Sequence, residues 1–394
     1  MSTPEIVIVA AARTPQGRLK GALASFTAPQ LGSFAIGGAL DKGGISRASI
    51  DAVIVGQVLA AGSGQNAARQ AAIGAGVGWD VPAHSVNKVC LSGLTAVIDA
   101  KRMILTGDAD VVVAAGMESM TNAPHLLQKS RFGYTYGSIE VLDHMAYDGL
   151  TDAYDEISMG ESTETFNGAY GFTREQQDEI AFLSHQRAAV AQAAGVFDDE
   201  IVPVEVPQRR GDPMVVSADE GVRPDTTREG LAALRPAFAD GGSITAGTSS
   251  QISDGASAVV VTTREKADVE GWTVLAVVGA AGQTAGPDNS LQPQPGTALR
   301  AALTKQGLSA SDLDLVELNE AFAAVVVQGR KDLGLPSDIV NPHGGAISLG
   351  HPIGASGNRL VVHAVHELAR RGTGTAAVAL CGGGGQGDAL ILTR

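Results

Sequence analysis

The pattern of structural elements in this chain occurs twice, about 264 residues apart. Residues 46–58 and residues 309–321 each contain a serine suited to cap a helix, then an aspartate, then a short apolar strand. Ser92 opens a helical stretch that runs into a strand, and Ser356 opens its counterpart at nearly the same offset. Because two separate pairs of elements keep one spacing, the sequence indicates a duplicated architecture.

Strand and helix signals alternate within each half. Short β-branched runs such as D-V-V-V-A-A-G are typical of buried strands. From Leu91 to Leu105 the apolar residues recur with helical spacing, and Gly107 supplies a stop. Alternation of this kind predicts an α/β fold with mainly parallel sheets covered by helices.

Residues 121–247 differ in composition from both halves. They are richer in Tyr, Asp, Glu, Arg and Pro, and they carry a helix signal over 173–194. We therefore expect three parts: an N-terminal half over 1–120 that is completed by about 248–270, a loop-rich insertion over 121–247, and a C-terminal half over 271–394.

The charge and the cysteine content argue against several classes of protein. A net charge of −14 and a pI near 5.0 disfavour nucleic acid and anionic membranes as partners, since both reward a basic face. Two cysteines make no disulfide framework, and there is no leader-like N-terminus and no long apolar run, so we expect a cytoplasmic protein.

Metal and nucleotide motifs are also missing from the sequence. His363 and His366 are three residues apart on an expected helix, where we predict a surface position, and no third ligand stands beside them. Neither a P-loop nor a dinucleotide-binding pattern occurs. The sequence therefore predicts no metal and no resident cofactor.

Two cysteines and one histidine stand in glycine-rich settings. Cys90 lies in N-K-V-C-L-S-G at an expected helix start, where the partial positive charge favours a thiolate. Cys381 opens C-G-G-G-G-Q-G-D-A, and His351 lies in G-G-A-I-S-L-G-H-P-I-G-A-S-G. Two thiols and an imidazole are the groups that covalent acyl transfer with proton abstraction requires. Each residue alone would also fit ordinary packing, because a free cysteine is commonly a small buried apolar side chain.

Asn319 begins N-E-A-F-A directly after the apolar run D-L-V-E-L. This places an amide at the carboxyl end of a predicted strand, where the sites of α/β proteins collect. The alternative for Asn319 and Glu320 is a plain helix cap.

Together these four motifs resemble the thiolase family across essentially the whole chain, and most closely its acetyl-CoA acetyltransferase branch. The motifs stand in the family's order. The resemblance implies a thiolase-like fold, with two similar βαβαβαββ halves that have mixed five-stranded sheets and with an inserted loop-rich domain. This agrees with the duplication inferred from the spacing.

The resemblance also implies a reaction. The enzyme would condense two acetyl-CoA reversibly to acetoacetyl-CoA and CoA by a ping-pong mechanism. Cys90 would form the acetyl-enzyme, His351 would take its proton, and Cys381 would remove a proton from the second acetyl-CoA. Asn319 would hold a water that completes one oxyanion site with His351, and the N–H groups of Cys90 and Gly383 would form the other. Coenzyme A would be substrate and product.

By the same resemblance, the insertion and its exit would recognise coenzyme A. Arg223 would lie against the adenine end, which also suits an arginine on so acidic a chain. Ser250 would contact the pantetheine, and Phe238, Ala246 and Phe322 would line its tunnel. Ordinary loop or core packing is the alternative for each of these residues.

Two positions depart from the family pattern. The branch usually has a histidine before the Met-Gly of the insertion, whereas this chain has Ser158 before Met159. That residue faces the substrate in relatives, so a roomier acyl pocket is expected here. His343 stands where asparagine is common. The run over 119–152 resembles the tetramerisation and cap region of biosynthetic enzymes, which favours a homotetramer over a dimer.

Other functions stay open on the sequence. One is a 3-ketoacyl-CoA thiolase of fatty-acid or sterol side-chain degradation, and another is a non-catalytic acyl-CoA-binding relative. The two cysteines, the histidine and the asparagine argue against a mere binder, which would be free to lose any of them. A third class, a decarboxylating condensing enzyme, would be expected to show two active-site histidines and one cysteine. The second cysteine of this chain counts against that class.

Overall fold

The computed structural model describes residues 4–394. Its strands are β1 (Ile6–Arg13), β2 (Gly17–Arg18), β3 (Ala52–Gly56), β4 (Ala83–Val86), β5 (Val111–Ser119), β6 (His125–Leu126), β7 (Leu142–Asp143), β8 (Val204–Val206), β9 (Met214–Val216), β10 (Ser253–Thr263), β11 (Ala276–Ala285), β12 (Leu315–Leu318), β13 (Thr375–Gly382) and β14 (Gln386–Thr393).

The α-helices are α1 (Ala28–Gly43), α2 (Ala67–Gly74), α3 (Ser92–Thr106), α4 (Met159–Tyr170), α5 (Arg174–Ala193), α6 (Arg228–Ala232), α7 (Arg264–Glu270), α8 (Gln294–Gln306), α9 (Ala323–Leu333), α10 (Ala346–Leu349) and α11 (Ile353–Arg371). Short helical turns of other types cover Arg47–Ser49, Ser130–Phe132, Met145–Gly149 and Ala310–Asp312.

The strands form one large mixed sheet whose order reveals the duplication. The order is β12-β13-β14-β11-β1-β10-β5-β3-β4. In the N-terminal half β3 pairs with β5 in parallel, and β10 and then β1 follow antiparallel. In the C-terminal half β12, β13, β14 and β11 repeat those directions. The halves join where β1 and β11 pair antiparallel.

The α/β fold class with mixed sheets is confirmed. The expectation of mainly parallel sheets, drawn from the alternation of strands and helices, is wrong, because within residues 4–394 only β3–β4, β3–β5 and β12–β13 pair in parallel in the large sheet. The two halves also differ in one detail. The N-terminal half has β4 as a fifth strand, whereas the corresponding C-terminal segment makes only an isolated parallel bridge between Val316 and Val340. The first repeated segments each contain a 3-10 turn followed by a strand, β3 in one half and β12 in the other.

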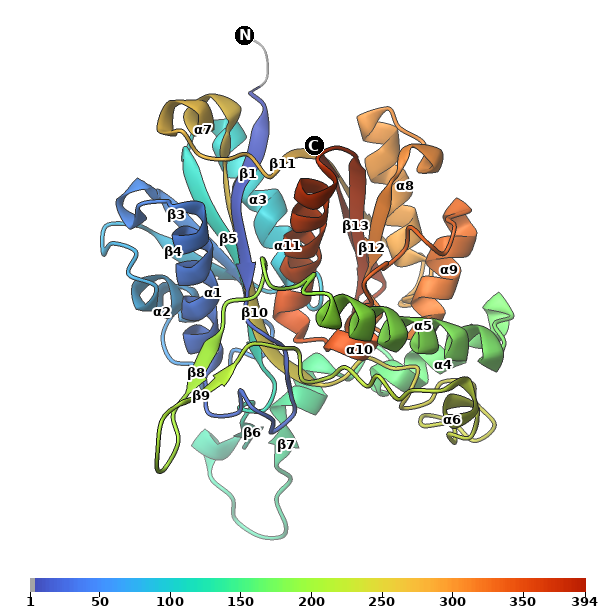
Figure 1. The fold of residues 1–394 in the computed structure, drawn as a ribbon. Helices are drawn as coiled ribbons and strands as arrows, with labels where there is room; N and C mark the ends of the chain where they lie inside the picture. Colours follow the sequence, from blue (N-terminus) through green and yellow to red (C-terminus); the bar gives the residue numbers. More distant parts are fainter. Residues whose placement is uncertain (1–3) are drawn as a thin grey trace.

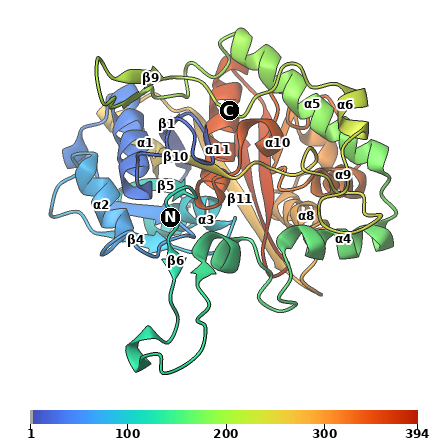
Figure 2. The same cartoon turned by 90° about the horizontal axis from the view of Figure 1, so that it is seen from below.

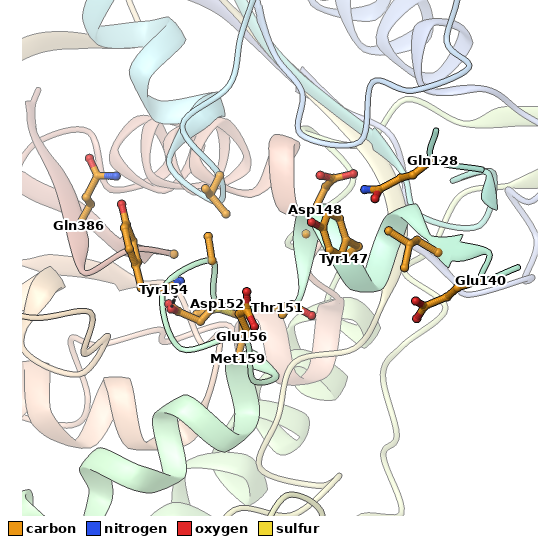
Figure 3. Close-up of a pocket in the computed structure, with 16 residues that line it drawn as sticks. Gln128, Glu140, Tyr147, Asp148, Thr151, Asp152, Tyr154, Glu156, Met159 and Gln386 are labelled. Carbon is orange, nitrogen blue, oxygen red and sulfur yellow. Dashed lines mark hydrogen bonds between the residues drawn. The ribbon is translucent and has the colours of Figure 1, made fainter. Parts of the chain in front are cut away.

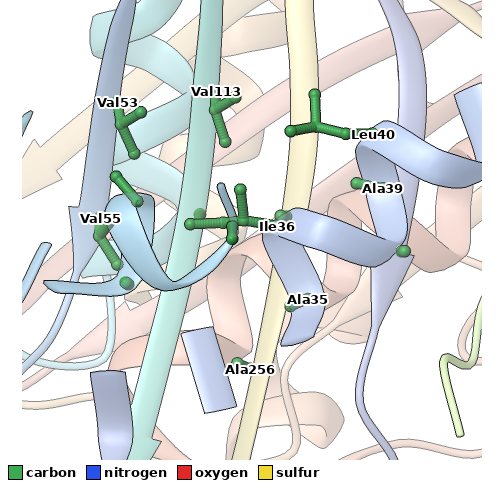
Figure 4. Packing of buried hydrophobic residues seen from close by; sticks show 14 of the residues in the cluster. Ala35, Ile36, Ala39, Leu40, Val53, Val55, Val113 and Ala256 are labelled. Atoms are coloured by element: carbon green, nitrogen blue, oxygen red, sulfur yellow. The ribbon is translucent and has the colours of Figure 1, made fainter. Parts of the chain in front are cut away.

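Helices and strands alternate as five layers (Figure 1). α1 and α2 pack on the outer face of the N-terminal strands, and their contact is made by alanine, valine, leucine and isoleucine side chains, several of which Figure 4 shows. α8 and α9 cover the outer face of the C-terminal strands. α3 and α11 lie between the two sets of strands and share one apolar core with both. The two central helices are therefore the duplicated pair.

α3 confirms the helix that the spacing predicts from Leu91 to Leu105. It covers Ser92–Thr106 and ends because Gly107 adopts a left-handed conformation with φ of 78°. α5 likewise matches the signal over 173–194, and it begins at a capping box between Thr173 and Gln176.

The chain between β5 and β10 contributes little to the large sheet. It contains α4, α5 and α6 and the small pairs β6–β7 and β8–β9. The segment around β6 and β7 extends away from the body of the molecule, as Figure 2 shows from below. α5 instead packs against α9 and α10, on the side of the C-terminal half.

Candidate active site

The turn that carries Cys90 is held in a conformation that few residues adopt. Val89, directly before the cysteine, has φ of 51°, which is strained for a β-branched residue. The hydroxyl of Ser92 accepts the backbone N–H of Lys88 at 2.8 Å and donates to the carbonyl of Val89 at 2.6 Å. The start of α3 thus fixes the turn and directs Cys90 toward the C-terminal half.

Glycines allow the two central helices to meet at the site. A Cβ on Gly93 of α3 would lie 2.8 Å from the backbone nitrogen of Asn358 and 2.9 Å from the carbonyl oxygen of Gly354, both on α11. A Cβ on Gly357 would lie 2.6 Å from the nitrogen of Leu94. Because these are backbone contacts, the helix that follows Cys90 and the helix that follows His351 touch directly.

His351 is buried, and its neighbours define which ring nitrogen carries the proton. Its Nδ1 lies 2.6 Å from the hydroxyl of Ser356, and that hydroxyl donates to the carbonyl of Pro352 at 2.9 Å. The hydroxyl hydrogen is already donated to that carbonyl, so Nδ1 of His351 carries the ring proton and Nε2 is unprotonated and can accept a proton. Burial, with Arg359 nearby, lowers the pKa of His351 to about 3, so the ring is a neutral base.

Asn319 lies beside that base. Its Nδ2 is 3.4 Å from His351 Nε2, and the asparagine is completely buried. The helix-cap alternative does not describe it, because Phe322 is the residue before α9. Glu320 has a structural role. Its carboxylate accepts hydrogen bonds from the N–H of Ile347 at 3.1 Å and from the hydroxyl of Ser184 at 2.6 Å. Glu320 therefore secures the segment that leads to His351.

Cys381 reaches the site from the hairpin of β13 and β14, and it is 1% exposed. A Cβ on the next residue, Gly382, would lie 2.6 Å from the side chain of Leu91. The backbone N–H groups of Cys90 and Gly383 counteract part of the rise that burial causes in the pKa of Cys90. The hairpin thus packs directly on the turn that holds Cys90.

An ion pair ties the same two segments together. Lys88 Nζ lies 2.6 Å from Oδ1 of Asp388, a completely buried residue opposite Leu380 in the β13–β14 register. Asp388 also accepts the hydroxyl of Thr95 at 3.0 Å and the amide of Gln283 at 3.2 Å. The charge is well compensated, and the bond fixes the spacing of the two cysteine segments.

All three reactive side chains line one narrow cavity of about 60 Å³. Half of its wall consists of residues that the sequence analysis singled out, and of the residues that the structure adds only Gly149, Leu150 and Leu291 lie outside the four motifs. The predicted members are Cys90, His351, Cys381, Gly383, Met159, Ser250 and Phe322; the added ones are Val89, Gly149, Leu150, Leu291, Ala321, Ile353 and Gly382.

Neither thiol is ionised at rest. Burial is the largest cause that raises the pKa of Cys90, to about 12, and the carboxylate of Glu118 adds to it, against the two backbone N–H groups. Burial likewise raises the pKa of Cys381, with a contribution from Cys90. The expectation of a Cys90 thiolate at a helix start is therefore wrong, because desolvation outweighs the helix end.

The residues expected around coenzyme A divide into two groups. Phe238 packs edge-to-face on Phe322 with ring centroids 6.0 Å apart, and both belong to the apolar cluster that includes Cys381. Ser250 donates its backbone N–H to the carbonyl of Ala321 at 3.0 Å. Ser250 and Phe322 line the cavity, whereas Phe238 packs on Phe322 without reaching the cavity wall.

The other three residues lie outside the cavity wall. Arg223 and Ala246 are exposed. Ser158 uses its hydroxyl to accept the N–H of Glu161 at 3.2 Å and so caps α4. A small side chain at this place therefore serves the helix start, and Met159 contributes to the cavity instead.

A larger cleft of about 690 Å³ adjoins the narrow cavity and shares Val89, Gly149, Met159 and Gly383 with it. Figure 3 shows its side chains, most of which come from the insertion. Four carboxylates lie in its wall, those of Glu140, Asp148, Asp152 and Glu156. This charge disfavours an anionic ligand in the cleft.

The prediction of a surface position for His363 is wrong. His363 is 2% exposed, and its Nδ1 lies 2.9 Å from Glu200, while its Nε2 lies 3.0 Å from His343. Its place on a central helix buries it between the halves. His366 is half-buried. Within residues 4–394, no group of three His, Cys, Asp or Glu side chains is placed to hold a metal ion.

No helix among the described residues combines the length and apolar character that crossing a membrane requires. The architecture and the cavity together define a class: a two-half α/β protein in which two cysteine thiols and a neutral, buried histidine meet in one cavity at the junction of the halves.

The comparisons with known proteins give the family. The family model described as "Thiolase, N-terminal domain" matches residues 6–265, and "Thiolase, C-terminal domain" matches residues 272–394. The chain belongs to the thiolase family and is an acyltransferase.

Similar curated proteins cover almost the whole chain. A protein of Mycobacterium tuberculosis named "Probable acetyl-CoA acetyltransferase" is 56% identical over 98% of both chains. "Acetyl-CoA acetyltransferase" of Chromobacterium violaceum is 50% identical over 99% of this chain and 100% of its own length. "Probable acetyl-CoA acyltransferase" of Staphylococcus epidermidis is 47% identical over 99% of this chain and 98% of its own length.

Proposed function

We propose that this protein is an acetyl-CoA C-acetyltransferase, which condenses two acetyl-CoA to acetoacetyl-CoA and CoA and also runs in reverse. The observation that carries the proposal is the convergence of Cys90, His351 and Cys381 on one narrow cavity. The names of the relatives support the same activity.

The first half-reaction transfers an acetyl group to Cys90. His351 Nε2 takes the thiol proton while the sulfur attacks the thioester carbon of acetyl-CoA. The carbonyl oxygen gains negative charge, which the N–H groups of Cys90 and Gly383 stabilise. The bond to the CoA sulfur breaks, and that sulfur leaves with the proton of Cys381. The enzyme is then acetylated, with His351 protonated and Cys381 a thiolate.

The second half-reaction restores both thiols. Cys381 takes a proton from the methyl group of a second acetyl-CoA, and charge moves to its carbonyl oxygen, near His351 and Asn319. The carbanion attacks the acetyl carbon on Cys90. Acetoacetyl-CoA forms, the Cys90 sulfur leaves, and it recovers its proton from His351. Protons and charges balance over the cycle.

The size of the cavity supports a short acyl group. A volume of about 60 Å³ suits an acetyl group better than a long chain. Met159, Leu150 and Leu291 stand in its wall, and the hydroxyl of Ser158 is used to cap α4, so the serine gives no evidence for a wider pocket. Hydrophobic walls discriminate by only about 1–3 kcal/mol per methylene, so activity on neighbouring substrates is expected.

Coenzyme A approaches from the side of Ser250, Phe238 and Phe322 in this proposal, because the adjoining cleft is lined by carboxylates. Arg223 is exposed and is proposed to meet the adenine end. Coenzyme A is then substrate and product, and no resident cofactor takes part. We further propose a homotetramer that works in the cytoplasm.

Two measurements test the function. Mass spectrometry after incubation with acetyl-CoA should place one acetyl group on Cys90; acetylation of Cys381 alone would contradict the assignment. The kcat/KM for thiolysis should be higher with acetoacetyl-CoA than with an eight-carbon 3-ketoacyl-CoA. The opposite order would favour the alternative, a degradative 3-ketoacyl-CoA thiolase.

A further inference from the structure

Glu118 is a buried carboxylate that the reaction described above does not use. It stands near the end of β5 and has no exposed surface. Its Oε2 accepts the backbone N–H groups of Val58 at 3.0 Å and Gly354 at 2.9 Å, and its Oε1 accepts that of Leu59 at 3.0 Å. Among residues 4–394 no cationic side chain forms an ion pair with it. A charge buried on backbone donors alone is costly and calls for an explanation.

The bonds of Glu118 join two segments at the site. Val58 and Leu59 follow β3, and Gly354 lies in the first turn of α11, three residues after His351. A Cβ on Gly354 would lie 2.7 Å from Oε2 of Glu118 and 2.8 Å from the Cα of Gln57. The glycine is therefore required by the close approach of helix, strand and loop. Glu118 fixes the chain after His351.

Cys90 lies against the same group of residues. Val58, Leu59 and Ile353 form a small apolar cluster, and Cys90 packs on it. The charge of the Glu118 carboxylate raises the pKa of Cys90 further than burial alone. The carboxylate of Glu118 is thus linked to His351 through its hydrogen bond to α11, and it acts on Cys90 through its negative charge.

We propose that Glu118 is a positioning residue of acyl transfer, which holds His351 in place and keeps the proton on Cys90 until His351 takes it. The proposal rests on the roles of Cys90 and His351 in the proposed function. A thiol kept uncharged is protected from alkylation and oxidation between turnovers. Its proton then leaves only toward the positioned base.

The charges around Cys90 give this proposal a pH dependence. Burial is the main cause that raises the pKa of Glu118 to about 7, and Asp254 on β10 adds repulsion. His351, with a pKa of about 3, stays neutral, and Cys381, with a raised pKa, stays a thiol. Glu118 is therefore ionised at pH 8.5 and largely neutral at pH 5.5. Glu118 should therefore raise the pKa of Cys90 at pH 8.5 and have no such effect at pH 5.5.

The test compares the wild-type chain with Glu118→Gln, and it measures the rate at which iodoacetamide alkylates Cys90. Glutamine keeps the size and loses the charge. Asp51→Asn is the matched control, because Asp51 accepts the N–H groups of Asp110 and Val111 at the other end of β5. Peptide mapping separates Cys90 from Cys381, and circular dichroism establishes that each variant is folded.

The expected result is alkylation of Cys90 about tenfold faster in Glu118→Gln at pH 8.5, which corresponds to one pKa unit, with no difference at pH 5.5. Asp51→Asn should match the wild type at both. Equal rates at pH 8.5 would overturn the electrostatic part. Equal acceleration at both pH values would also overturn it, because a loosened fold exposes the thiol at any pH.

A second measurement tests positioning through single-turnover acetylation by acetyl-CoA. The glutamine amide turns a donor toward a backbone N–H, so acetylation should be at least about tenfold slower with KM little changed. Glu118→Asp keeps the charge on a shorter side chain. In this variant Cys90 should be alkylated at the wild-type rate but acetylated more slowly. Glu118→Asp also replaces Glu118→Gln in the test of positioning if the glutamine variant does not fold. Wild-type acetylation rates in either variant would overturn positioning. If Cys90 of the wild type is not acetylated, the proposed function is contradicted. The alkylation rates would still show whether the charge of Glu118 keeps Cys90 protonated.

Discussion

At the scale of single residues, burial decides the proton chemistry of the site. Cys90 and Cys381 are both thiols at neutral pH because desolvation raises their pKa values. His351 is a neutral base for the same reason, since burial lowers its pKa to about 3. One physical cause therefore leaves the protons on the sulfurs and a lone pair on the imidazole. Proton transfer within the cavity then starts from an uncharged set of groups.

The roles proposed for the two cysteines lead to a first prediction. Cys381→Ser should slow carbon–carbon bond formation by roughly 10²–10⁴-fold, because it removes the base for the methyl proton. Acetylation of Cys90 should fall much less, since the departing CoA can take its proton from His351. Rapid-quench measurement of acetyl-enzyme and of acetoacetyl-CoA gives both rates. Equal losses in the two steps would contradict the division of roles.

His343 leads to a second prediction, which concerns stability. Burial is the main cause that lowers its pKa to about 4, with His363 adding to the effect, whereas an unfolded histidine titrates near 6.5. The folded state then disfavours protonation, so this stabilisation is complete above pH 6.5 and is lost as the pH falls toward 4. His343→Asn should reduce the loss of unfolding free energy between pH 7.5 and pH 5, as measured by urea denaturation. The same loss in both proteins would contradict this.

At the scale of elements, the site exists because two helices cross without side chains between them. α3 and α11 each begin beside a reactive residue, and Gly93, Gly354 and Gly357 allow their first turns to touch. The hairpin of β13 and β14 approaches the same place through Gly382. The glycines of the motifs thus serve the close approach of backbones, and this approach brings Cys90, His351 and Cys381 to one cavity.

A pair of glycine variants tests the helix crossing. Gly93→Ala should destabilise the protein by about 1–3 kcal/mol, because its Cβ meets backbone atoms of α11 that cannot move separately. Gly168→Ala is the control: this α4 glycine has no atom within 4 Å of the added Cβ and should gain about 0.5–1 kcal/mol. Chemical denaturation measures both. A neutral Gly93→Ala that also acetylates Cys90 at the normal rate would contradict the account.

At the scale of the whole molecule, the insertion presents apolar surface that one chain leaves uncovered. Phe132 and Tyr136 are 91% and 102% exposed, in the segment that extends beyond the body in Figure 2. Further apolar side chains of the same segment are at least 40% exposed: Leu127, Tyr134, Ile139 and Val141. Exposed apolar patches of this kind mark contacts between proteins. They support the proposed homotetramer.

Removal of the two aromatic rings tests that assembly. The double variant Phe132→Ser, Tyr136→Ser should have a smaller mass in solution than the wild type, with tetramers reduced to dimers. Val269→Ser is the control, since Val269 is 77% exposed at the end of α7. Light scattering after size-exclusion chromatography measures each mass. An unchanged tetramer would show that this segment does not hold it together, and a dimeric wild type would contradict the tetramer itself.

The sequence alone predicted several of the elements and the candidate reactive residues. Helical spacing with a glycine stop predicts α3, and a capping serine, an aspartate and an apolar run predict β3 and β12, because each signal lies within one short segment. The constant offset between the repeats predicts two similar halves. Local chemistry likewise marks Cys90, His351 and Cys381 as candidates.

Only the tertiary structure decided which of these groups meet and how they ionise. Burial depends on contacts between residues hundreds of positions apart, so neither the raised pKa of Cys90 nor the interior place of His363 can be derived from neighbouring residues. Glu118 and Leu291 carry no local signal, and they belong to the site because distant segments pack there. The hydroxyl of Ser158, which the motif placed near the substrate, caps a helix instead. Desolvation and long-range packing act through the folded chain, and no short segment contains them.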